Sequence, residues 1–162
     1  MLNNMPKGRI WRVRDDIVLC GSAASADLRI RGFQVVDYIF NPEAAYNYLS
    51  TEKQEGLAVV DVSLVSRDIP RAGRFGSENT NGFYLTGVKL MEELIAANPR
   101  KFPEHAMLMT IADPVTSIYK DAKEFCRVHR IPLIEGRDVA DPYEFGNVVQ
   151  KRYEQVFGRR VD

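Results

Sequence analysis

The chain has 162 residues, and its 22 basic and 22 acidic side chains leave no formal net charge. A balanced charge creates no overall field that would attract nucleic acid, so we expect no direct nucleic-acid binding. No apolar run approaches the 18 or so residues of a membrane span, and the first residues lack the apolar core of a signal peptide. We therefore expect a cytoplasmic protein without membrane association, built as a single domain over residues 1–162.

Short apolar or β-branched runs recur along the chain and predict five β-strands. In chain order they are residues 9–13, 33–40, 57–62, 106–112 and 130–135. Helical patterns lie between and after these runs, which is typical of strand-helix-strand units with a parallel sheet. The sequence predicts a three-layer, flavodoxin-like α/β fold, with helices on both faces of a five-stranded parallel sheet.

Three helix starts carry the same signal, a capping side chain followed by proline. They are Asn41-Pro42, Asp113-Pro114 and Asp141-Pro142. A further helix is predicted from Thr86, with apolar residues on one face and Asn98-Pro99 as its stop.

The stretch before the first predicted helix has two interpretations, because the run "IVLCG" at residues 17–21 would also suit a buried strand. If that run were the first strand, Asp15 and Asp16 would lie at its entry, far from Asp61. The run "RIWRV" at residues 9–13 would then have no place in the sheet, so we favour it as the first strand.

Polar residues follow three of the predicted strands. Asp61 ends the third strand, Asp15 and Asp16 follow the first, and Thr110 follows the fourth. In parallel sheets functional residues collect where the carboxyl ends of the strands meet the loops. A single aspartate at a strand end is commonly a turn or capping group, but the shared placement of these residues predicts an acidic pocket.

A long polar segment, residues 66–83, begins just beyond Asp61 and has no periodicity. It is longer than most loops within a compact domain. Two interpretations stay open, a plain solvated excursion and an ordered lid or partner-binding loop.

These residues resemble the receiver (CheY-like) domain of two-component response regulators over almost the whole chain. The resemblance lies in Asp15-Asp16 as the acidic pair, "RGFQVV" before the second strand, "LAVVDVSL" as the phosphoacceptor segment, "TGVKLMEEL" as the third-helix start, and "LMTIAD" with Thr110 as the hydroxyl. Residues 66–83 then count as an insertion after the third strand.

The resemblance implies that Asp61 accepts a phosphoryl group and that Thr110 couples this event to the surface. It implies a Mg²⁺ site formed by Asp16, Asp61 and the backbone carbonyl of Ser63, with Asp15 acting partly through water. The implied partners are a histidine kinase or phosphotransfer protein and a downstream effector protein, and receivers of this kind also pair as homodimers. The protein would be a signalling switch and not an enzyme with turnover.

The sequence departs from the family at the end of the fifth strand, where a lysine is usual. No lysine occurs between Lys123 and Lys151, and the lysine position falls near Glu135 to Arg137. The aromatic switch residue of the fifth strand is missing as well. One hypothesis is that Arg67, Arg71 or Arg74 of the insertion supplies the missing charge.

Two alternatives to the phosphoacceptor interpretation remain. The first is a pseudo-receiver, in which the same fold serves as a phosphorylation-independent protein-interaction module; the missing lysine favours it. The second is an unrelated flavodoxin-like domain that binds or hydrolyses a ligand.

Overall fold

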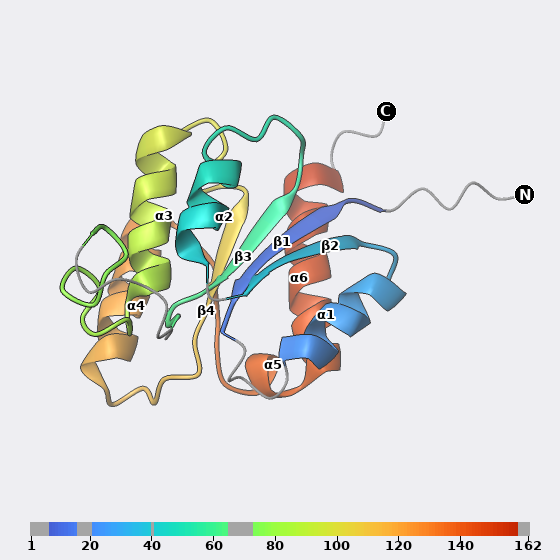
Figure 1. Ribbon diagram of the computed structural model, residues 1–162. Coiled ribbons are helices and arrows are strands. Elements are labelled where there is room, and N and C mark those ends of the chain that lie inside the picture. Colours follow the sequence, from blue (N-terminus) through green and yellow to red (C-terminus); the bar gives the residue numbers. More distant parts are fainter. Residues whose placement is uncertain (1–6, 16–20, 40, 65–72, 159–162) are drawn as a thin grey trace, which may run out of the picture.

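The computed structural model describes residues 7–15, 21–39, 41–64 and 73–158, and every structural statement below concerns these ranges. Within them the strands form one parallel sheet in the order β2-β1-β3-β4-β5 (Figure 1). The strands are β1 (Arg9–Arg14), β2 (Gln34–Ile39), β3 (Leu57–Asp61), β4 (Ala106–Met109) and β5 (Leu133–Ile134). The predicted flavodoxin-like fold class is therefore confirmed.

Helices cover both faces of the sheet, which gives the predicted three layers (Figure 1). One face carries α2 (Pro42–Leu49), α3 (Thr86–Ala97) and α4 (Ser117–His129), and the other carries α1 (Gly21–Ile30), α5 (Arg137–Ala140) and α6 (Pro142–Phe157). No helix in the described ranges has both the length and the apolar character needed to cross a membrane.

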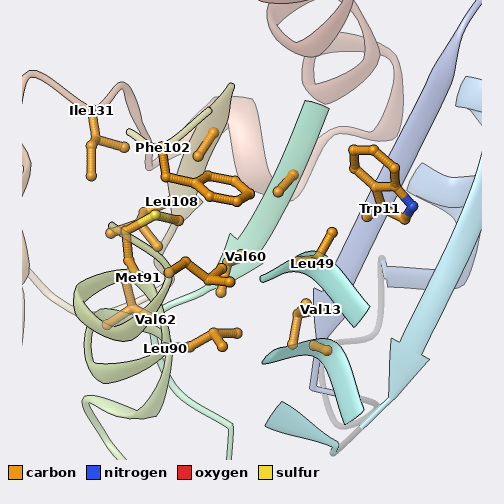
Figure 2. Close-up of a cluster of buried hydrophobic side chains, with 14 of the residues drawn as sticks. Trp11, Val13, Leu49, Val60, Val62, Leu90, Met91, Phe102, Leu108 and Ile131 are labelled. Carbon is orange, nitrogen blue, oxygen red and sulfur yellow. The ribbon is translucent and has the colours of Figure 1, made fainter. Parts of the chain in front are cut away.

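The face under α2, α3 and α4 is packed with apolar side chains (Figure 2). Strands β1 and β3 contribute Trp11, Val13 and Val60, and the helices contribute Leu49 and Leu90. All five are at most 1% exposed. Burying one such side chain stabilises the fold by about 1.5–3 kcal/mol, so this layer holds the helices on the sheet.

The opposite face mixes apolar and charged side chains. Successive residues of a strand point to opposite faces, so Arg12 and Arg14 share the face of Ile10 and not that of Trp11. Both arginines are buried, as is Ser25 of α1. This face therefore contains a polar cluster inside the core.

Strand β1 pairs with β2 on one side and β3 on the other, so "RIWRV" is the first strand as we favoured. The alternative that placed the first strand at residues 17–21 is wrong. Residues 17–20 of that run lie outside the described ranges, and Gly21 begins α1.

Two of the three predicted helix starts are confirmed. Asn41 accepts a hydrogen bond from the Ala44 N–H (2.9 Å) at the start of α2, and Asp141 accepts one from the Tyr143 N–H (2.9 Å) at the start of α6. The prediction at Asp113-Pro114 is wrong.

Helix α4 begins three residues after Pro114, at Ser117, with Thr116 as its capping residue. Asp113 instead accepts a hydrogen bond from the Val115 N–H (3.0 Å), which closes a turn before the helix. Aspartate stabilises such turns as readily as helix starts, and that turn chemistry prevails here.

The described part of the predicted insertion, residues 73–83, packs against the helices. Phe75 is buried in the apolar layer with Leu90 and lies near Tyr46 of α2. Thr80 is also buried and donates a hydrogen bond to the Gly76 carbonyl (2.8 Å). This stretch is ordered structure and not a plain solvated excursion, whereas residues 66–72 fall in a part that is not described.

Candidate functional site at the carboxyl edge of the sheet

Four of the candidate residues lie around one small pocket. Strands β1, β3 and β4 are neighbours in the sheet, so the residues after their carboxyl ends meet at one edge. Asp15, Asp61, Ser63 and Thr110 line a cavity of about 40 Å³ there. A cavity of this size accommodates about two water-sized groups.

A direct hydrogen bond joins the ends of β1 and β3. The backbone N–H of Asp15 donates to Oδ2 of Asp61 at 2.9 Å. Both carboxylates are buried, and Asp61 is only 4% exposed. The two acids of the described part thus face the same pocket, whereas Asp16 lies outside the described residues and its position is not assigned.

Thr110 and Ser63 already make local hydrogen bonds. Thr110 Oγ1 accepts from the Ala112 N–H (3.1 Å), and the Ser63 hydroxyl donates to the Tyr84 carbonyl (2.7 Å). A threonine hydroxyl keeps one hydrogen to donate while it accepts, so Thr110 is still equipped to bond an anion in the pocket.

The start of α3 is fastened to the backbone of the Asp61 segment. The Gly87 N–H donates to the Val62 carbonyl at 2.8 Å. A Cβ at Gly87 would overlap the Asp61 carbonyl oxygen, so only glycine permits this close approach. This explains physically why "TG" suits the start of that helix.

A buried arginine beneath Asp61 was missed by the sequence reasoning. The Arg12 side chain is fully buried, and its Nη2 lies 3.8 Å from Asp61 Oδ1. Its Nη1 donates to the Ser25 hydroxyl (3.2 Å), and its guanidinium lies 4.8 Å from the ring centre of Phe145. The signal was present in the sequence, because a central strand of a sheet covered on both faces should be apolar throughout.

The polar cluster continues from Ser25 to the edge of the sheet. The Ser25 hydroxyl donates to Asp37 of β2 (3.1 Å), and Asp37 also accepts from Arg14 Nε and Arg29 Nη2 (3.0 Å each). Burial alone would raise the pKa of Asp37, but the hydrogen bonds and charge of Arg14, with Arg29 and Ser25, outweigh it and lower that pKa. Asp37 therefore stays ionised and holds this cluster together.

At Asp61 the effect of burial on the pKa outweighs the effect of the neighbouring positive charges. Its pKa is raised from 3.8 to about 7, chiefly by burial and in smaller part by the charge of Asp15, while Arg12, the Asp15 N–H and Arg14 oppose the rise. Without an added cation, burial therefore favours the protonated form of Asp61 over the ionised form that an exposed aspartate takes at neutral pH. A cation in the pocket would favour the ionised form.

The donor set suits a hard cation. Asp61 Oδ1 is buried and accepts no hydrogen bond from the described residues, and Asp15 lines the same pocket. Carboxylate oxygens are the ligands that Mg²⁺ prefers. The described residues contain no group of three acids, histidines or cysteines arranged for a metal, so a complete site would also need Asp16 or a backbone carbonyl.

The residues near which the lysine position was expected, Glu135 to Arg137, lie directly after β5. The carboxylate of Glu135 pairs with Lys123 Nζ of α4 at 3.2 Å. Arg137 begins α5 and is not among the residues that line the Asp61 pocket. Neither residue brings a positive charge to Asp61.

Arg74 does not cover Asp61, as one hypothesis for the insertion arginines required. Its guanidinium pairs with Glu43 (2.6 Å) and lies 3.7 Å from the ring centre of Tyr46, both on α2. Arg67 and Arg71 lie outside the described ranges.

The sheet order and the polar pocket at its carboxyl edge define a receiver-like α/β fold. Among solved structures, the chain is similar to full-length FixJ from B. japonicum, with a TM-score of 0.59 and 16% sequence identity. The match covers 94% of this chain and 60% of the FixJ chain, so this chain corresponds to less than two thirds of that protein. No family model and no curated protein sequence matches the chain.

Proposed function

We propose that this protein is a receiver module of two-component signal transduction, which accepts a phosphoryl group on Asp61 and thereby switches a protein-interaction surface. The observation that carries the proposal is the convergence of Asp15, Asp61, Ser63 and Thr110 on one small pocket at the carboxyl edge of a receiver-like sheet. The fold likeness to FixJ supports it at the level of architecture.

In the proposed reaction, a carboxylate oxygen of Asp61 attacks the phosphorus of a phosphohistidine or of a small acyl phosphate. A new O–P bond forms while the P–N or P–O bond of the donor breaks, and the leaving group keeps the electron pair. Mg²⁺, held by Asp15, Asp16, Asp61 and the Ser63 carbonyl, would supply positive charge for the ionised carboxylate and the transferring group. The product is an acyl phosphate on the protein, which makes the reaction a switch and not enzymatic turnover.

The chain's own groups orient the nucleophile. The Asp15 N–H holds Oδ2 of Asp61 at 2.9 Å, so the carboxylate has one fixed orientation at the strand end. After transfer, Thr110 would donate its hydroxyl hydrogen to a phosphoryl oxygen. That bond would pull on the segment after β4, where Thr110 now holds Ala112.

The proposed partners follow from this chemistry. A histidine kinase or phosphotransfer protein supplies the phosphoryl group, and an effector protein or a second copy of the chain responds to it. A groove of about 530 Å³ lies between residues 111–114, which follow β4, and helix α5, and it offers one place for such a contact.

One observation favours the pseudo-receiver as the second candidate. Glu135 stands near the position expected for the lysine and is paired with Lys123, so no cation from β5 reaches the pocket among the described residues. In that case the fold would act as an interaction module without phosphoryl transfer.

Incubation with Mg²⁺ and acetyl phosphate, followed by intact-mass measurement, separates the two candidates. We expect the mass of one added phosphoryl group, which Asp61→Asn abolishes and EDTA prevents. Asp113→Asn is the matched control, because Asp113 is an aspartate that follows the neighbouring strand β4 and does not line the Asp61 pocket. An unmodified mass in a folded protein would favour the pseudo-receiver, and an adduct that persists in Asp61→Asn would refute Asp61 as the acceptor.

A further inference from the structure

Arg12 holds two groups at once inside the core. Its Nη2 lies 3.8 Å from Asp61 Oδ1, and its Nη1 donates to the Ser25 hydroxyl of α1 at 3.2 Å. A guanidinium buried to 0% exposure is costly unless it is paired, so these contacts determine where it sits. A change of charge at Asp61 therefore acts directly on a group that also holds α1.

The path from Arg12 leads to the surface in two further steps. Ser25 donates to Asp37 at 3.1 Å, and Asp37 accepts from Arg29, which is half exposed on α1. Each link from Arg12 outward is a hydrogen bond between side chains of different elements, and the link from Asp61 to Arg12 is an ion pair at 3.8 Å. Asp61 is thus connected to the edge formed by α1 and β2.

No equivalent link leads from Asp61 toward β4 and β5 among the described residues. The Asp61 pocket is lined by Asp15, Asp61, Ser63, Met109, Thr110 and Ile111, and none of these described residues is basic. Directly after β5, the Glu135 carboxylate is paired with Lys123 of α4. In the described ranges, Asp61 forms its ion pair with Arg12.

We propose that Arg12 senses the charge at Asp61 from beneath and passes the response to α1 through Ser25 and Asp37, so that the α1–β2 edge responds to phosphorylation. This inference rests on the proposed function of Asp61. A phosphoryl group adds negative charge and attracts the guanidinium more strongly, which weakens its bond to Ser25 and loosens α1. Removal of the charge would let Arg12 bond Ser25 more closely.

Hydrogen exchange of the α1 amides, residues 21–30, tests the inference in two arms. The first arm adds negative charge by adding beryllofluoride to the protein in Mg²⁺, with the protein in Mg²⁺ alone as its reference, and the second removes negative charge with Asp61→Asn. We expect α1 exchange to rise about fivefold or more in the first arm and to fall in the second. Ser25→Ala should abolish both changes.

Ser22→Ala is the matched control, because Ser22 lies on the same helix with its side chain exposed. It should leave both changes intact. Arg12→Lys keeps a buried positive charge without the forked geometry, so we expect the beryllofluoride response of α1 to weaken while ¹⁹F NMR still shows binding.

The outcomes also separate this inference from the proposed function. If beryllofluoride does not bind but Asp61→Asn still slows α1 exchange through Ser25, the phosphoacceptor function fails and the charge relay stands. If beryllofluoride binds and α1 exchange stays constant, or if Ser25→Ala behaves as Ser22→Ala does, the relay is refuted.

Discussion

The two faces of strand β1 differ in chemistry although they alternate residue by residue. Trp11 and Val13 point into a layer of apolar side chains under α2 and α3, whereas Arg12 and Arg14 point into a polar cluster under α1. Apolar packing contributes stability that does not depend on charge, while a buried ionic cluster changes its energy whenever one member changes charge. The comparison suggests that one face of the sheet supports the fold and the other responds to Asp61.

A large effect that does not depend on pH should come from a cavity in the apolar face. Leu90 is fully buried there (Figure 2), and Leu90→Ala should lower the free energy of unfolding by about 3–4 kcal/mol. Urea denaturation measures this loss, which should be the same at pH 5.5 and pH 8. Leu90→Met keeps the volume and should cost about 1 kcal/mol; a pH-dependent loss for Leu90→Ala would contradict the division between the faces.

On the polar face, stability should depend on pH through Asp61 when metal is removed with EDTA. Its pKa is about 7 in the folded chain against an ordinary value of 3.8, so the folded state binds more protons between these values. The stability contribution is therefore complete below about pH 4 and is lost as pH rises to about 7, by at most roughly 4 kcal/mol. Denaturation at several pH values should show this slope in the wild type and not in Asp61→Asn.

Asp37 offers a control of opposite sign on the same face. Its pKa is lowered in the folded chain, so its contribution is present at neutral pH and is lost as the pH falls below the ordinary carboxyl range. Asp37→Asn should thus lose most stability at neutral pH. Equal pH profiles for the Asp37 and Asp61 variants would contradict the assigned charge balance.

Loss of a helix-capping side chain should have the smallest effect on stability, and the effect should be similar on the two faces of the sheet. Asn41 caps α2 on the apolar face and Asp141 caps α6 on the polar face, and replacement of either by alanine should cost about 1 kcal/mol. Thermal unfolding of the two variants checks this. Asp113→Ala should cost less, because Asp113 closes a turn ahead of α4 and does not cap the helix; a larger loss there would restore Asp113 as a helix start.

Patterns that are local in sequence predicted much of the fold. The apolar runs placed the strands, and the capping signals placed the starts of α2 and α6, because both depend on neighbours within a few residues. The signal at Asp113 failed for the same reason, since Thr116 nearby also caps a helix and only the assembled loop selects between them. Strand β5 was overestimated: of residues 130–135, only Leu133 and Ile134 pair with β4.

The site was predictable only in part. The placement of Asp15, Asp61 and Thr110 at strand ends followed from the order of the elements. The role of Arg12 did not, because its contacts come from Ser25, Asp61 and Phe145, which lie 13 or more residues away in the chain. The burial of Phe75 could not be predicted either, because a single aromatic residue in a polar segment forms no periodic pattern.

The depth of Arg12 has a consequence for how the protein responds to ionic strength. Dissolved salt weakens attraction between exposed charges over about 8–10 Å but reaches buried pairs far less. The Lys123–Glu135 pair is 53% and 37% exposed, whereas the side chains of Arg12 and Asp61 are 0% and 5% exposed. A signal carried beneath Asp61 would thus keep its strength when the salt concentration of the surroundings changes, while contacts at the end of β5 would not.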